Sequence, residues 1–254
     1  LPGAAGAAAA GLFTIARKLS SVVQLVRIAF TYVMAPLAAS AEREDRRQVA
    51  DIYAYATRLI SAIALPLAAV LAAGSASLLG LFGHGAQTAQ AALVILLFAR
   101  AAEAVLGISA PVLQVVAAFR QQLTASIFGV AVAVGAGWLI VGHLDPLTGV
   151  TLATAIGLVV MAAVPMLQLA LIEKLHPFDA QFPAVALRGI AITLVAGTAA
   201  VFADLLPDPI SLPLLGLIAV TAIWLALRFA LPLADRMSLG KTGRKLRLFK
   251  QEGA

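Results

Sequence analysis

Seven long apolar segments, separated by short polar stretches, constrain the fold of this chain more than any other feature. A helix rises 1.5 Å per residue, so about 20 apolar residues cross the hydrocarbon core of a bilayer, and each segment is about this long or longer. Only 12% of the residues are charged, against about 25% in soluble domains. The sequence therefore predicts an all-α, polytopic membrane helix bundle with about seven transmembrane helices. The segments are Ala8–Ala38, Ala54–Phe82, Thr88–Ala118, Leu123–Val141, Thr148–Ile172, Pro183–Ala203 and Ile210–Leu233.

The charges of the connecting stretches predict an orientation. Most of the 18 Lys and Arg residues lie in or beside the loops of one side and in the C-terminal tail. The loops of the other side, Gly83–Gln87, Gly142–Leu147 and Asp204–Pro209, contain neither Lys nor Arg. By the positive-inside rule the C-terminus is cytoplasmic and, with an odd number of spans, the N-terminus is outside. Because the sequence begins at Leu1 without a basic signal-like region, we expect a fragment of a longer protein.

The first segment is apolar but carries a stripe of polar residues on one side. At roughly 100° per residue the stripe covers an arc of about 140°. Unpaired polar groups in hydrocarbon are unfavourable by several kcal/mol, so the stripe favours a helix that faces a polar, water-filled cavity. The alternative for its two arginines is that they snorkel to the headgroups. The stripe consists of Thr14, Arg17, Ser20, Ser21, Gln24, Arg27 and Thr31.

The third segment holds the other unusual polar set, since Arg100, Glu103, Gly107 and Gln114 share one helix face. Arg100 and Glu103 are spaced to pair with each other, either simply to neutralise their charges in the bundle or with Arg100 turned toward a ligand anion. Glu103 is the one acidic residue clearly inside a span, so it is the candidate for coupling transport to a cation. Gln114, like Gln24, has the alternative of bonding a neighbouring helix.

Catalytic patterns are missing from the sequence. There is no cysteine and no phosphate-binding Walker loop, and the three histidines do not form a metal-binding pattern. We therefore expect no enzyme activity and no cofactor. The basic tail Lys241–Lys250 is predicted to contact anionic membrane lipid rather than nucleic acid. Trp138, Tyr53 and Tyr55 lie near segment ends and are interpreted as anchors at the membrane interface.

Three sequence runs resemble the polysaccharide flippases (Wzx-type) of the MOP superfamily. Gly11-Leu-Phe-Thr-Ile-Ala-Arg-Lys-Leu is similar to the eighth helix of that family, with Phe13 in place of the commoner tyrosine. Leu81-Phe82-Gly83 resembles the end of the ninth helix. Gly142, Asp145-Pro and the run from Gly149 to Thr154 resemble the outer turn that opens the twelfth. The match covers nearly the whole chain, as helices eight to fourteen.

The resemblance implies the C-terminal lobe of a two-lobed transporter of the bacterial inner membrane, with a separate N-terminal lobe as its partner. Such a protein moves a polyprenyl-pyrophosphate-linked sugar across the membrane by alternating access. It implies a transport core in residues 1–175, two additional helices in 176–235 and a basic cytoplasmic tail in 236–254. The candidate substrate-binding residues are Arg17, Ser20, Ser21, Gln24, Arg27, Arg100, Glu103 and Gln114.

Three other functions remain open at this stage. A multidrug or cation antiporter of the same superfamily would carry an acid-dominated cavity, which two arginine-bearing helix faces disfavour. A membrane-embedded polymerase or glycosyltransferase would carry catalytic residues in a large external loop, and every loop here is short. The third alternative is a membrane assembly component that does not transport.

Overall fold

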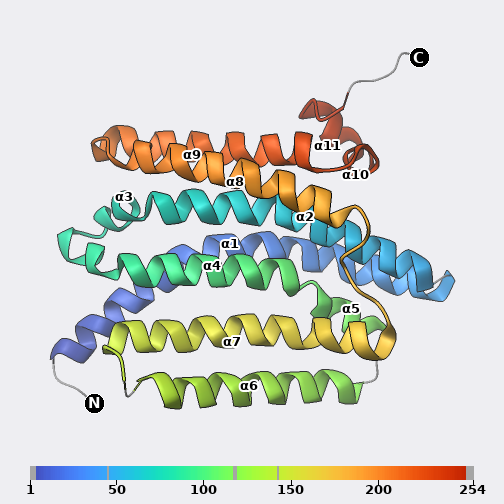
Figure 1. Ribbon diagram of the computed structural model, residues 1–254, viewed down its shortest axis with the longest axis horizontal. Coiled ribbons are helices and arrows are strands. Elements are labelled where there is room, and N and C mark those ends of the chain that lie inside the picture. Colours follow the sequence, from blue (N-terminus) through green and yellow to red (C-terminus); the bar gives the residue numbers. More distant parts are fainter. Residues whose placement is uncertain (1–3, 45, 117–118, 142, 250–254) are drawn as a thin grey trace.

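The computed structural model describes residues 4–44, 46–116, 119–141 and 143–249, and all regular elements in this part are helical (Figure 1). The N-terminal residues 1–3, the end of the predicted third segment, Gly142 of the predicted outer turn and the tail residues 250–254 lie outside the described residues. The long helices are α1 Ala4–Glu44, α2 Arg46–Ala73, α4 Gln90–Leu106, α6 Phe119–Val141, α7 Pro146–Gln168, α8 Phe182–Asp204 and α9 Asp208–Leu225.

Short helical pieces complete the chain between and after the long helices. Two of them, η2 and η3, are π-helical turns that continue α7 and α9, and η1 is a 3₁₀ turn. The short pieces are α3 Ser75–Gly80, η1 His84–Ala89, α5 Ser109–Val116, η2 Leu169–Glu173, η3 Ala226–Ala230, α10 Leu233–Ser238 and α11 Gly240–Lys245.

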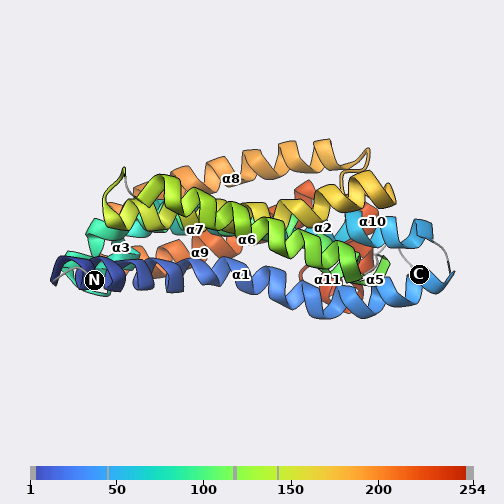
Figure 2. The same ribbon diagram turned by 90° about the horizontal axis from the view of Figure 1, so that it is seen from below.

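The predicted membrane bundle is confirmed. Six helical stretches of the described chain are long and apolar enough to cross a membrane, and α6 contributes a shorter apolar stretch, Ser126–Ile140. The long helices run side by side along the longest axis of a thin slab (Figures 1 and 2). The α1–α2 connection and the C-terminal tail lie at one end of this slab, and the start of α1 and the α8–α9 connection lie at the other (Figure 1).

Helices α1, α2 and α4 pack against one another and form the centre of the bundle. Their core is built from fully buried aliphatic side chains such as Ile60, Leu93, Leu96 and Ile108. The α6–α7 pair packs on this centre chiefly through α4, and the α8–α9 pair packs chiefly through α2 (Figure 1). Helix α1 lies along one face of the slab (Figure 2), and α4 is one of the two helices that pack most closely against it.

The sequence sets several of the helix ends. The third predicted segment is not one helix, because the chain breaks after Leu106 and α5 begins at Ser109, just before Pro111. Helix α7 begins where the Asp145 carboxylate accepts a hydrogen bond from the Thr148 backbone N–H at 3.0 Å. This contact holds the pKa of Asp145 below its ordinary value, because it stabilises the ionised carboxylate.

A buried ion-pair network fastens the tail to the bundle. The Arg58 guanidinium of α2 donates to both carboxylate oxygens of Asp235 in α10, with Nε–Oδ2 at 2.7 Å and Nη2–Oδ1 at 2.9 Å. Its third nitrogen, Nη1, pairs with Asp179 in the segment before α8. Arg58 and Asp235 are each only 6% exposed. One arginine thus joins α2 to the segment that precedes α8 and to the tail.

The predicted interface anchors behave differently from one another. Trp138 is 88% exposed on α6, as a side chain directed toward lipid would be. Tyr53 is only 1% exposed and belongs to the main apolar core, so its interpretation as an anchor is wrong. Position near a segment end did not reveal that α2 is enclosed by its neighbours along this stretch.

Candidate anion-binding cavity

A polar cavity of about 420 Å³ opens beside α1, where α1 packs against α4. Helix α1 supplies most of the lining, and α4 adds Arg100. Arg17 lies roughly 16 Å along α1 from Gly6, the first residue of the stretch that is long and apolar enough to cross a membrane. The α1 residues that line it are Phe13, Thr14, Arg17, Lys18, Ser21 and Gln24.

The cavity lining is cationic. Arg17 and Lys18 are exposed in it, and neither makes an ion pair with any residue that the structure describes. The hydroxyls of Thr14 and Ser21 donate to carbonyls one turn earlier, at 2.8 and 2.6 Å, so they are not free donors for a ligand. The groups available to an anion are therefore the basic side chains and the Gln24 amide.

Glu103 lies behind the cavity and binds two arginines from different helices. Its Oε2 accepts a hydrogen bond from Arg100 Nη1 at 2.6 Å within α4, and its Oε1 lies 3.1 Å from Arg27 Nη2 of α1. The exposed fractions of the Glu103 and Arg100 side chains are 12% and 8%. The cluster keeps one net positive charge, since one carboxylate serves two guanidiniums. The Nε atoms of both arginines are buried without a hydrogen-bond partner.

Gly107 makes the approach of Arg27 to Glu103 possible. A Cβ placed on Gly107 would lie 2.8 Å from Arg27 Cδ and 2.5 Å from the Glu103 carbonyl oxygen. Real side chains do not tolerate such contacts, so any larger residue must displace Arg27 or the end of α4. The face that Gly107 shares with Arg100 and Glu103 is thus shaped to receive an α1 side chain.

The structure brings some of the predicted substrate-binding residues together in the cavity and places the others outside it. Arg17, Ser21, Gln24 and Arg100 come together in the cavity, and Arg27 joins Glu103 directly behind it. Ser20 is fully buried and donates to the Arg17 carbonyl at 3.0 Å, which places it in the packing surface. Gln114 is exposed on α5, beyond the break that ends α4.

Sequence reasoning missed two lining residues, Phe13 and Lys18. Lys18 follows Arg17 directly and lies about 100° around the helix, outside the main stripe. The lysine side chain is long enough to reach the cavity from this position. The sequence signal that could have identified Lys18 was therefore its position next to Arg17. Among the described residues no group of three His, Asp or Glu side chains is placed to hold a metal ion.

Comparisons with known proteins do not assign the chain to a protein family. No family model, no curated protein and no solved structure matches it.

Gly107→Ala is expected to destabilise the protein by about 1–3 kcal/mol, because the new methyl group overpacks the contact between Arg27 and Glu103. Thermal unfolding of the purified protein in detergent measures the effect. Gly135→Ala is the matched control, since nothing lies within 4 Å of the added Cβ in the middle of α6. Equal unfolding temperatures for the two variants would contradict the close contact at Gly107.

Proposed function

We propose that this protein is the C-terminal lobe of a membrane transporter that moves an anionic, polyprenyl-pyrophosphate-linked sugar across the bacterial inner membrane. The observation that carries the proposal is the cationic cavity beside α1, within the apolar stretch Gly6–Tyr32. Arg17, Lys18 and Arg100 line it, and the one acidic residue next to it, Glu103, is already held by two arginines. The resemblance to Wzx-type flippases supports the same conclusion, and the run that carries it includes the cavity residues Arg17 and Lys18.

In this mechanism the arginines bind the pyrophosphate. A guanidinium offers two parallel N–H donors that match phosphate oxygens, which an ammonium group cannot do. Arg100 touches both the cavity and Glu103, so it can exchange the Glu103 carboxylate for a phosphate while Arg27 keeps Glu103 neutralised. An incoming anion thus weakens the Arg100–Glu103 contact within α4 but leaves the Arg27–Glu103 pair, which links α1 to α4, in place.

Alternating access requires a second body across the cavity. Helix α1 supplies all of the cavity lining except Arg100, and in the family that the chain resembles a second lobe lies across the central cavity. We place this lobe there, with the lobes rocking about the bound substrate. The α8–α9 pair contacts the rest of the bundle chiefly through α2, which suits two helices outside the transport core.

The charge distribution supports a cytoplasmic C-terminus. The start of α6, the α7–α8 connection, the start of α8 and the tail lie at one end of the slab, and the α6–α7 connection and the end of α8 lie at the other (Figure 1). The first set carries the basic residues Arg120, Lys174 and Arg188, and the second carries Asp145 and Asp204. The positive-inside rule assigns the basic end to the cytoplasm. A cation antiporter is the weaker alternative, because both carboxylate oxygens of Glu103 are engaged by arginines rather than open to the cavity.

Arg17→Gln and Arg100→Gln are each expected to lower transport about tenfold or more, since each removes a charged hydrogen bond to the phosphate. The measurement is complementation, at matched expression, of a bacterium that lacks its polysaccharide flippase. Surface polysaccharide should fall and lipid-linked precursor should accumulate on the cytoplasmic side.

Arg120→Gln is the control for this experiment, because Arg120 is exposed at the basic end of α6 and does not line the cavity. It removes the same charge without touching the proposed phosphate site. Full activity of both cavity variants would reject the anion-binding mechanism, and failure of the wild-type gene to complement would reject the flippase assignment itself.

A further inference from the structure

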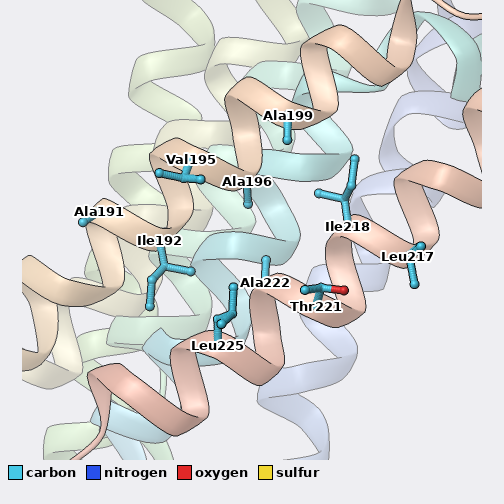
Figure 3. Close-up of a pocket in the computed structure, with 10 residues that line it drawn as sticks. All are labelled: Ala191, Ile192, Val195, Ala196, Ala199, Leu217, Ile218, Thr221, Ala222 and Leu225. Carbon is cyan, nitrogen blue, oxygen red and sulfur yellow. The ribbon is translucent and has the colours of Figure 1, made fainter.

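Helix α9 is flanked by two apolar grooves. One, of about 450 Å³, lies between α8 and α9, with side chains of both helices directed into it (Figure 3). The other, of about 340 Å³, lies between α9 and Leu246 of the tail. Both are inside the part of α9 that is apolar enough to span a membrane. Grooves of this kind exclude water, because water would find almost no hydrogen-bond partners there.

A single ridge of α9 separates the grooves. Thr221 lines both of them, and Trp224 lines the second. Arg228 lies in η3, the π-helical turn that follows α9, and its guanidinium lies over the ring of Trp224. A cation therefore lies beside the second groove, next to Trp224.

Arg228 is held in this place by the folded tail. Its guanidinium carbon lies 5.1 Å from the ring centre of Trp224, and its Nη1 donates to the Arg247 carbonyl at 2.9 Å. Trp224 in turn donates from Nε1 to the Leu246 carbonyl at 2.9 Å. Arg244, Lys245 and Arg247 of the tail are exposed, and so is Arg188 of α8, a helix that packs against η3. Residues 236–249 contain no acidic side chain to neutralise them.

We propose that this surface is a specific site for one anionic phospholipid. Its two acyl chains occupy the two grooves on either side of the α9 ridge, and its phosphate lies on Arg228 with the basic tail around it. A two-chain lipid fits two grooves that share Thr221 on the helix that leads to Arg228, and a negative headgroup matches the exposed basic side chains there. Bound there, the lipid holds the tail against α9. The site is independent of the α1–α4 cavity and of the transport function proposed for it.

The test uses the fluorescence of Trp224, which lines the second groove. The chain has two tryptophans, so a Trp138→Phe background leaves Trp224 as the sole reporter. Phosphatidylglycerol and phosphatidylcholine with the same dibrominated acyl chains are titrated into the purified protein, because bromine quenches a nearby indole. One basic side chain near a membrane surface is worth about a fivefold preference for the anionic lipid, and we expect at least this.

Variants separate headgroup recognition from groove filling. Arg228→Gln should abolish the preference for phosphatidylglycerol, Arg228→Lys should keep part of it, and Arg120→Gln should leave it unchanged. Ala199→Phe should fill the α8–α9 groove and weaken quenching by phosphatidylglycerol. Val201→Phe is its control, because Val201 is 50% exposed on the same helix and outside that groove.

Two results would overturn the site. The first is equal quenching by both headgroups, or a preference that survives Arg228→Gln. The second is displacement of phosphatidylglycerol by a single-chain polyprenyl phosphate at a lower mole fraction, which would show that one long chain, rather than two acyl chains, is the occupant.

Discussion

Glu103→Gln is expected to lower the free energy of unfolding by about 3–5 kcal/mol, the range found when one partner of a buried ion pair is removed. Glutamine keeps the shape of the side chain but removes the charge that holds Arg27 and Arg100 together. Two guanidiniums then face each other at low exposure with no carboxylate between them. Thermal and denaturant unfolding in detergent, followed by circular dichroism, measure the loss.

A second substitution tests whether this loss comes from the uncompensated arginines. Arg27→Gln combined with Glu103→Gln removes one of the two like charges and leaves Arg100, which opens into the cavity. The double variant should therefore be more stable than the sum of the single effects predicts, by about 0.5–3 kcal/mol. Asp51→Asn is the control, because Asp51 is an exposed carboxylate on α2, and an exposed change of this kind stays within about 0.5 kcal/mol. Strict additivity would mean that Glu103 does not link α1 to α4.

The cavity could be predicted from the sequence in part, because helical periodicity is a local property. The stripe on the first segment identified the side of α1 that carries Arg17, Ser21 and Gln24, and the spacing of Arg100 and Glu103 identified their pair. Helical periodicity relates the positions of residues only within one continuous helix. Gln114 was grouped with Arg100 as if the segment were continuous, and the break after Leu106 removes that relation.

Contacts between helices could not be predicted, because they depend on how the helices pack. Arg27 was placed correctly on the polar stripe, yet nothing in the sequence around Arg27 identifies Glu103 as its partner. Ser20 lies at the same edge of the stripe as Arg27, and packing buries it. The stripe thus divides lengthwise into a part that faces the cavity and a part that faces protein, and only the fold decides where the division falls.

The same limit applies to the Arg58 network. Arg58 was counted among the basic residues that flank the loops, whereas its partners Asp179 and Asp235 are 121 and 177 residues away. One signal was present, because Arg58 falls inside the apolar second segment, as Arg100 falls inside the third. A charged residue within a span needs a partner, and acids in the loops at the same end of the bundle were the candidates.

Arg58→Met is expected to destabilise the protein by about 3–5 kcal/mol and to release the tail, because it leaves the buried Asp235 carboxylate beside Asp179 without a cation. The tail should be affected most, because the Arg58–Asp235 pair joins α10 to α2. Limited trypsin digestion should therefore cleave faster at Lys241, Arg244 and Lys245 than in the wild type. Thermal unfolding of the same samples measures the global effect.

Pairing the substitutions distinguishes loss of a charge from loss of packing. Arg58→Met with Asp235→Leu replaces the buried ion pair by apolar side chains of similar size, which is often neutral or stabilising, and Asp179 is exposed enough to be solvated. This double variant should recover most of the stability and restore slow cleavage of the tail. Arg120→Met, a basic residue at the same end but exposed, should match the wild type in both measurements. If Arg58→Met also matched the wild type, the apolar contacts of Leu231 and Leu248 and the hydrogen bonds of Trp224 and Arg228 to tail carbonyls would suffice to hold the tail, and the ion pairs would contribute nothing to its position.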